Sequence, residues 1–232
     1  MKTNKKVIII TGGNSGLGKA TAEILTSQNQ VIILGKNAKE IEKTVKDLKC
    51  DGIICDVTEE KQIHNAFSQI VKKYKRVDCL INCAGVWIKG PIEQNSPNEI
   101  RNAILVNTLG TILTVNALVS QLKQQKYGRI INIISQAGLS AKPERSVYNA
   151  SKWAVTGFTK CIQLELGPFN ISVVGFYPGF FHTDIFEKAG DHKTDFSTAM
   201  PVEKVAKALA SLVETDSELV IKTFEIQSIK QP

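Results

Sequence analysis

Tyr148 and Lys152 are the two residues whose types and spacing most directly indicate chemistry. A helix is predicted from Tyr148 to about Leu166, and residues four apart lie on one face of a helix, so both side chains can point into one site. A tyrosine with its ordinary pKa of about 10 is a poor base at neutral pH, but a neighbouring ammonium group lowers that pKa. The pair therefore predicts general acid–base catalysis, although the same spacing is frequent on ordinary helices.

Ser135 and Asn107 have the right types to complete such a site. Ser135 ends a predicted strand 13 residues before Tyr148, where its hydroxyl can bind a substrate oxygen and stabilise charge that develops on it. Asn107 lies inside a long apolar helix, in the run Val-Asn-Thr-Leu-Gly over residues 106–110. Each residue alone has a simpler interpretation: a tyrosine on a helix surface, a serine in a turn, or a buried asparagine bonded to backbone.

A glycine-rich loop follows the first predicted strand and opens a helix, with the sequence Thr-Gly-Gly-Asn-Ser-Gly-Leu-Gly over residues 11–18. Its glycines permit a tight turn and let backbone N–H groups approach a pyrophosphate, which the dipole of the following helix also favours. Glycines also simply make turns, but a strand before and a helix after favour dinucleotide binding. The expected contacts are Gly12, Asn14, Ser15, Gly16, Leu17 and Gly18.

Together these motifs resemble those of the short-chain dehydrogenase/reductase family, over roughly residues 7–185. The loop matches the family's T-G-x-x-x-G-x-G pattern, and the catalytic tetrad is matched in order by Asn107, Ser135, Tyr148 and Lys152. The resemblance implies an NAD(P)-dependent enzyme that interconverts a carbonyl and an alcohol, with the tyrosine as general acid/base. In the family the asparagine locally disturbs its helix and holds a water, which continues a proton path from the cofactor ribose and the lysine.

The resemblance assigns further cofactor contacts after later strands. An acidic residue after the third strand contacts the adenine amino group, and the turn at 82–85 resembles the family's N-N-A-G motif beside the adenosine ribose, with Cys83 in place of its second Asn. Residues 178–183 resemble a P-G-x-x-x-T segment that holds the nicotinamide carboxamide. The residues assigned in this way are Asp56, Val57, Asn82, Ala84, Gly85, Pro178, Gly179, Phe181 and Thr183, besides Tyr148 and Lys152.

The end of the second strand selects between NAD and NADP. An acidic residue there binds the ribose 2′-hydroxyl of NAD, whereas a basic residue favours the 2′-phosphate of NADP. Lys36 stands at this point, and Glu40 lies further along in the next helix. The family's NADP-preferring members often carry a second basic residue inside the glycine loop, where this chain has Ser15. We therefore expect NADP(H) as the preferred cofactor and NAD(H) as the alternative.

An α/β fold must position these residues. Short apolar strands alternate with amphipathic helices along the chain, which predicts right-handed crossovers and a parallel sheet with helices on both faces. We expect a single doubly wound Rossmann-fold domain over residues 1–232, with ligands at the carboxyl ends of about seven parallel strands. The candidate strands are Val7–Thr11, Val31–Gly35, Gly52–Cys55, Cys79–Asn82, Arg129–Ile134, Ser172–Tyr177 and Val220–Ile226.

The helices between them show recognisable starts. Asn37 stands three residues before Glu40, as a capping box requires, Thr58 is the expected cap of the next helix, and Pro201 precedes the last one. From Ile100 to Leu122 the pattern is apolar on more than one face. Such a helix is either buried centrally or shared with a second subunit, so a homodimer or homotetramer is expected.

Two segments are expected to determine the substrate: residues 136–147 after Ser135, and a lid around residues 180–200. The lid is apolar where it begins, which favours an apolar or modest-sized carbonyl compound. His182 lies in this lid and is either a second acid/base residue or, more simply, a lid side chain.

Composition argues against several other classes of protein. The chain has 232 residues and no stretch that we expect to be apolar enough over a sufficient length to span a bilayer, and the apolar run at 7–10 is too short for a signal peptide, so a cytoplasmic protein is expected. Its five cysteines are an odd number without a C-x-x-C pair, so neither a disulfide framework nor a metal site is expected.

Two rival functions stay open at this point. The net charge of +7 could serve a nucleic acid, but the lysines are scattered rather than gathered, so we expect a small-molecule substrate and no nucleic-acid partner. A catalytically silent NADP(H)-binding regulatory or scaffold protein on the same fold is the other rival, since a fold does not determine function. The intact Tyr148 and Lys152 favour an enzyme.

Overall fold

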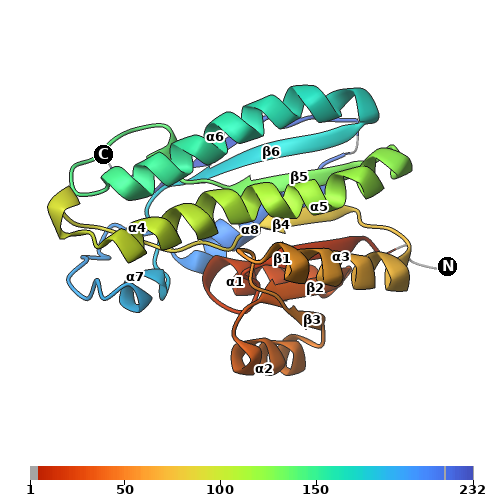
Figure 1. Cartoon of the computed structure of the whole chain (residues 1–232), viewed down its shortest axis with the longest axis horizontal. Coiled ribbons are helices and arrows are strands. Elements are labelled where there is room, and N and C mark those ends of the chain that lie inside the picture. Colours follow the sequence, from red (N-terminus) through yellow and green to blue (C-terminus); the bar gives the residue numbers. More distant parts are fainter. Residues whose placement is uncertain (1–4, 217, 232) are drawn as a thin grey trace.

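A computed structural model of the chain describes residues 5–216 and 218–231. Within these residues, seven parallel strands form one sheet in the order β3-β2-β1-β4-β5-β6-β7 (Figure 1). The strands are β1 (Val7–Thr11), β2 (Gln30–Gly35), β3 (Asp51–Ile54), β4 (Cys79–Asn82), β5 (Gly128–Ile133), β6 (Ile171–Pro178) and β7 (Thr223–Ile226). The α-helices are α1 (Gly16–Leu25), α2 (Ala38–Leu48), α3 (Glu60–Tyr74), α4 (Pro97–Ile104), α5 (Gly110–Gln125), α6 (Ser146–Leu166), α7 (Ile185–Lys188) and α8 (Val202–Glu214).

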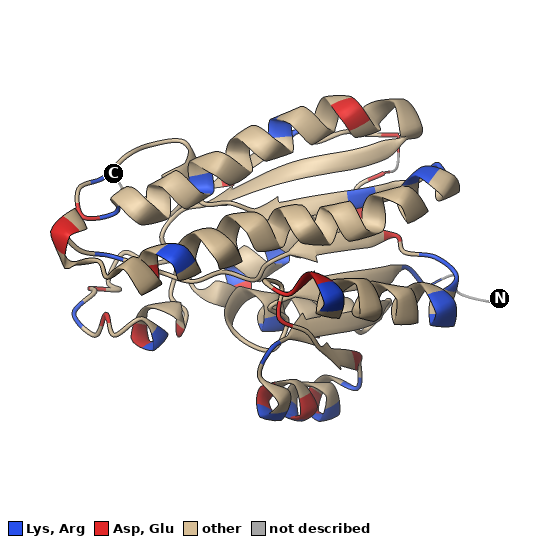
Figure 2. Cartoon of the chain, in the orientation of Figure 1, with Lys and Arg blue, Asp and Glu red and all other residues tan. Residues whose placement is uncertain are grey.

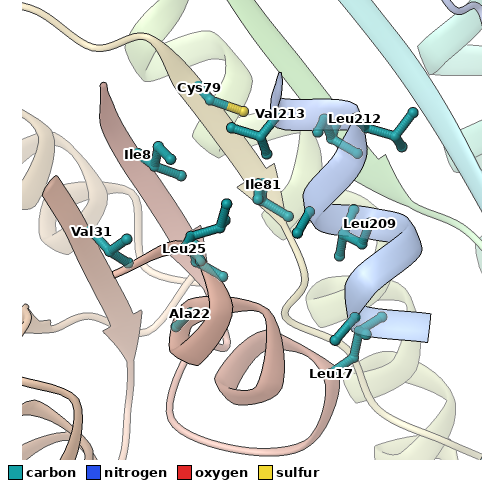
Figure 3. Close-up of a cluster of buried hydrophobic side chains, with 14 of the residues drawn as sticks. Ile8, Leu17, Ala22, Leu25, Val31, Cys79, Ile81, Leu209, Leu212 and Val213 are labelled. Atoms are coloured by element: carbon teal, nitrogen blue, oxygen red, sulfur yellow. The ribbon is translucent and has the colours of Figure 1, made fainter. Parts of the chain in front are cut away.

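Both faces of the sheet are buried, as the continuous apolar strands require. Side chains of a strand alternate between its two faces. Along β1, Ile8 and Ile10 belong to a core cluster with α1 and α8, whereas Val7 and Ile9 belong to a cluster with α3, α5 and α6. Figure 3 shows the first cluster, between the strands, α1 and α8. The predicted doubly wound α/β fold is therefore confirmed.

The strand order reverses between β1 and β4, because β2 and β3 extend to one side of β1 and β4 to β7 to the other. In such sheets ligands bind in the crevice at this reversal, beyond the carboxyl ends of the strands. The glycine loop follows β1, residues 83–85 follow β4, Ser135 follows β5 and residues 179–183 follow β6. The fold therefore collects the predicted motifs at one edge.

Three local predictions need correction. The last strand begins at Thr223 rather than Val220, and it pairs parallel to β6 at the edge of the sheet. Thr58 does not cap α3, because its N–H and hydroxyl both donate to the Asp56 carboxylate and the helix begins two residues later. Only half of the predicted capping box at Asn37 forms. The Asn37 side chain accepts from the N–H of Glu40, but the Glu40 carboxylate accepts from Asn14 instead of completing the box.

The predicted long helix is continuous over 29 residues, Pro97–Gln125, and consists of α4, a π-helical turn at Leu105–Leu109, and α5. By length and composition this helix is long and apolar enough to cross a membrane, so the expectation that no stretch is so apolar is wrong. In this fold the helix packs against the sheet, since Val115, Leu118 and Leu122 belong to the second core cluster. Only 39 % of the most apolar window is buried, which leaves apolar side chains on its outer face.

Candidate active site

A cavity of about 510 Å³ lies at the carboxyl ends of the strands. Most of the predicted site residues line it, from the glycine loop, the turn after β4, the end of β5, the start of α6 and the segment after β6. The predicted residues in its wall are Gly12, Ser15, Gly16, Leu17, Gly18, Ala84, Gly85, Ser135, Tyr148, Lys152, Pro178, Gly179, Phe181 and Thr183.

The glycine loop packs closely against the turn after β4. Gly12 has φ +66°, and a Cβ on it would lie 2.9 Å from the Cα of Ala84. The hydroxyl of Thr11 accepts from the N–H groups of Cys83 and Ala84, both at 3.1 Å, which fixes the turn after β4 against the loop. Within the described residues, the Ser15 side chain does not cap α1, so the first N–H groups of that helix stay open to an anion. These features fit the pyrophosphate of a dinucleotide.

Lys152 projects from α6 and is only 5 % exposed. Its Nζ donates to the backbone oxygen of Ile133, at the end of β5, over 3.0 Å. Burial lowers the pKa of this amine to about 8, and the nearby Cys83 thiol partly opposes that change. The sheet therefore holds the lysine in place, and burial disfavours its protonated form.

Tyr148 is the acid/base candidate at the centre of the cavity. Its ring centroid lies 5.8 Å from the Nζ of Lys152. Burial raises the pKa of Tyr148 to about 12, while a hydrogen bond with Ser135 and the positive charge of Arg145 partly oppose the rise. Ser135 has φ +143°, a backbone conformation that favours glycine, and such strain is frequent at functional sites. The arrangement brings a protonated phenol, a hydroxyl and an amine to one place.

Asn107 lies behind this group rather than in the cavity wall. It is 1 % exposed and sits in the π-helical turn, so the predicted disturbance of the helix is present. Its amide exchanges two hydrogen bonds with the backbone of Val86 and donates a third to the hydroxyl of Ser151, which in turn donates to the backbone oxygen of Tyr148. Asn107 therefore links the turn after β4 to the helix that carries the tyrosine and the lysine.

Two predicted cofactor contacts near the second strand end lie outside the cavity wall. Lys36 is exposed, and the side chain of Asn14 donates to the carboxylate of Glu40 at 2.5 Å. Glu40 also lies 3.8 Å from the Nζ of Lys188 on the lid. The carboxylate of Glu40 is therefore drawn back to the glycine loop, which its position inside α2 did not predict.

Three further predicted contacts have structural partners. The Asp56 carboxylate accepts from Thr58. Val57 packs against Gly110 at the start of α5, so closely that a Cβ on Gly110 would lie 2.8 Å from the Val57 side chain. Asn82 is 3 % exposed and bonds to Asn132, so its amide belongs to a buried network between the strands. None of these three is among the residues that line the cavity.

The sequence reasoning missed the residues that hold the lid over the cavity. The indole N–H of Trp87 donates to the Asp191 carboxylate at 3.3 Å, and Lys89 lies 3.9 Å from the same carboxylate. At the other end, Gln231 donates to the backbone oxygens of Phe180 and Thr198 and accepts from the N–H of Phe180. Trp87 comes two residues after the N-C-A-G turn and could have been noticed, whereas no sequence pattern relates Gln231 to a segment 51 residues away.

His182 is not among the residues that line this cavity. Its ring lies 4.2 Å from that of Phe196, and its backbone N–H donates to Met200. These contacts fit the simpler interpretation of His182 as a lid side chain.

A family model described as short chain dehydrogenase matches residues 6–194. The 3-ketodihydrosphingosine reductase of Bacteroides thetaiotaomicron is 35 % identical over 178 residues, which are 77 % of this chain and 65 % of that protein. The 3-oxoacyl-[acyl-carrier-protein] reductase FabG of Thermotoga maritima is 30 % identical over 233 residues, 95 % of each chain.

Solved structures give the same picture of the fold. The structure of ElxO with NADP bound has a TM-score of 0.86 and 28 % identity, over 96 % of this chain and 97 % of that one. The closed form of a serine dehydrogenase complexed with NADP+ has a TM-score of 0.91 over 97 % of this chain and 96 % of that one. At 22 % identity, this second likeness supports the fold alone.

Proposed function

The chain belongs to the short-chain dehydrogenase/reductase family of oxidoreductases, and on that premise we propose that it interconverts a carbonyl and an alcohol with NADP(H), using Tyr148 as general acid/base. The observation that carries the proposal is the meeting of Ser135, Tyr148 and Lys152 in one cavity beside the glycine loop. Reductases of 3-oxo compounds among the relatives support the direction of the chemistry.

A bound nicotinamide cofactor would supply the hydride. The hydroxyls of Ser135 and Tyr148 then donate hydrogen bonds to the carbonyl oxygen and hold it for reaction. Because burial keeps the pKa of Tyr148 at about 12 in the cofactor-free protein, the phenol is protonated at neutral pH and ready to give its proton to that oxygen. The ammonium group of Lys152 stabilises the phenolate that remains, and in the reverse direction the phenolate takes the alcohol proton.

The residues present fit a dinucleotide. The N–H groups of the glycine loop and of the start of α1 would hold the pyrophosphate, and the Thr183 hydroxyl with the backbone near Phe181 would hold the nicotinamide carboxamide. Lys36, at the end of β2, would bind the 2′-phosphate of NADP. The NADP bound to ElxO supports this preference. Glu40 beside the loop makes NAD(H) the alternative.

The direct test is Tyr148→Phe, with Tyr127→Phe as a matched control in a tyrosine before β5, away from the cavity. NADPH binding is measured by fluorescence titration, and oxidation of NADPH is followed with a panel of small ketones and aldehydes. We expect Tyr148→Phe to bind NADPH normally and to lose nearly all turnover, with the control unchanged. Turnover that survives in Tyr148→Phe contradicts the proposal. NADPH binding by the natural protein without turnover of any carbonyl in the panel also contradicts it, and that result favours a silent scaffold.

We further propose that the protein is a homodimer formed through the outer faces of α4, α5 and α6. The π-helical turn between α4 and α5 exposes Leu105 and Leu109 by 41 % and 37 %, and α6 exposes Trp153 and Leu164 by 50 % and 75 %. Figure 2 shows few charges along α5 and α6 compared with α2. Apolar side chains grouped on neighbouring helices are typical of a subunit interface.

A further inference from the structure

The substrate end of the cavity has an aromatic wall next to the reacting tyrosine. The ring of Trp87 meets that of Tyr148 edge-on with 4.6 Å between centroids, and it also meets that of Phe186 edge-on at 5.2 Å. Phe180 continues this wall, 5.6 Å from Phe186. This part of the cavity suits the carbon chain of a substrate.

Arg145 stands at the edge of that wall. It immediately precedes α6 and lies three residues before Tyr148, and both side chains line the cavity. Its guanidinium lies 5.2 Å from the ring centroid of Trp87, and its charge acts on the Tyr148 phenol. Among the described residues, no carboxylate forms an ion pair with Arg145.

Other cations line the same cavity. Lys142, from the loop after β5, and Lys193, from the lid, also line the cavity, and within the described chain neither side chain has a carboxylate partner. The two carboxylates in the wall are engaged elsewhere: Asp184 pairs with Lys188 at 2.8 Å, and Asp195 accepts from Ser197. The positive end of the α6 dipole adds to the excess of positive charge.

We propose that the substrate is an oxo acid, a carbonyl compound with a carboxylate a few atoms away, and that Arg145 binds this carboxylate with help from Lys142 and Lys193. The planar guanidinium can hold a carboxylate through two parallel hydrogen bonds, which orients the chain as well as attracting it. Because Arg145 and Tyr148 line the same cavity and both approach the ring of Trp87, a substrate can present its carboxylate to the guanidinium and its carbonyl to the phenol. This inference rests on the proposed function of the same site.

The test compares acids with their methyl esters, which differ in charge but little in shape. 3-Oxobutanoate, 4-oxopentanoate and 5-oxohexanoate are each paired with the ester, and kcat/KM with NADPH is measured for both. For at least one length we expect the acid to be preferred about tenfold or more, as hydrogen bonds to charged groups predict. Arg145→Gln should remove about tenfold of that preference, mainly through the KM of the acid, while Arg145→Lys retains part of it.

The ratio of acid to ester is the decisive quantity, because any change in the pKa of Tyr148 affects both substrates alike. Lys160→Gln, an exposed lysine of the same helix, is the control and should leave the ratio unchanged. If esters are reduced as well as acids, or if the ratio survives Arg145→Gln, the oxo-acid inference is wrong while the proposed function stands. If the natural protein reduces neither acids nor esters, nor any carbonyl in the wider panel, both are wrong.

Discussion

The side-chain amide of Asn107 exchanges two hydrogen bonds with the backbone of Val86: its Oδ1 accepts from the N–H at 2.8 Å and its Nδ2 donates to the carbonyl at 3.0 Å. A third bond runs from Nδ2 to the Ser151 hydroxyl at 3.1 Å. Both amide hydrogens are therefore used, and the polar groups they satisfy are largely buried. The pair fixes the distance between the turn after β4 and the catalytic helix.

We expect Asn107→Ala to lower the free energy of unfolding by about 3 kcal/mol, because it leaves buried polar groups without partners. Chemical denaturation of the cofactor-free protein measures this change. Asn102→Ala, on the exposed side of the same helix, is the control and should cost well under about 1 kcal/mol. Equal effects of the two substitutions would show that the Asn107 bonds contribute little to stability.

The buried Lys152 predicts a pH dependence of stability. Its pKa falls from 10.5 to about 8 in the folded protein, so between these values the unfolded chain holds more protons at this group. The free energy of unfolding should therefore rise with pH, by about 2 kcal/mol between about pH 8 and 10, relative to Lys152→Met. Urea unfolding of both proteins across this range tests the expectation. A constant difference between them would contradict it, and Lys160→Met controls for loss of a lysine on the same helix.

Cofactor choice should depend on two residues with opposite charge. Lys36→Ala is expected to lower kcat/KM for NADPH about tenfold, because the 2′-phosphate loses a charged partner, and to change that for NADH little. Glu40→Gln should raise kcat/KM for NADPH relative to that for NADH, since it removes a carboxylate that Asn14 holds beside the loop. Lys39→Ala, an exposed neighbour, is the control. Equal losses with both cofactors would remove Lys36 from the selection.

The proposed dimer is testable at Leu109. A charge placed in an apolar interface is left without a partner there, so Leu109→Glu should weaken dimerisation by at least about tenfold. Sedimentation velocity over a range of concentrations measures this. Ile54→Glu places the same charge on the exposed edge strand β3, at a side chain that is 54 % exposed, and should leave the dimer intact. A natural protein that sediments as a monomer would contradict the proposal.

The parts of the site that could be predicted from the sequence are those that follow directly from a strand end or a helix start. The glycine loop, Ser135 and Tyr148 each stand at such a point, and the parallel sheet brings all such points to one edge. The parallel topology of the sheet could also be predicted, because right-handed crossovers between apolar strands leave few alternatives.

The parts that could not be predicted depend on side chains that meet across the fold. Glu40 looked like half of a capping box, but its carboxylate bonds to Asn14, 26 residues away. Thr58 had the type of a helix cap, but the closer Asp56 carboxylate takes both its donors. Arg145 stood in a segment assigned to substrate selection, yet its approach to Trp87 depends on how two loops fold over the cavity.

The π-helical turn at Leu105–Leu109 has an evolutionary consequence. A π turn is an α-helix that carries one additional residue, so removing one residue from this turn would let Pro97–Gln125 run on as a regular helix with both of its halves in their present places. The long helix would keep its packing against the sheet, but it would have no wide turn from which Asn107 reaches Val86 and Ser151. A gene that loses this single codon would therefore encode a chain with the same helix against the sheet, but the turn after β4 would no longer be tied to the helix of Tyr148 and Lys152, at the stability cost expected for Asn107→Ala.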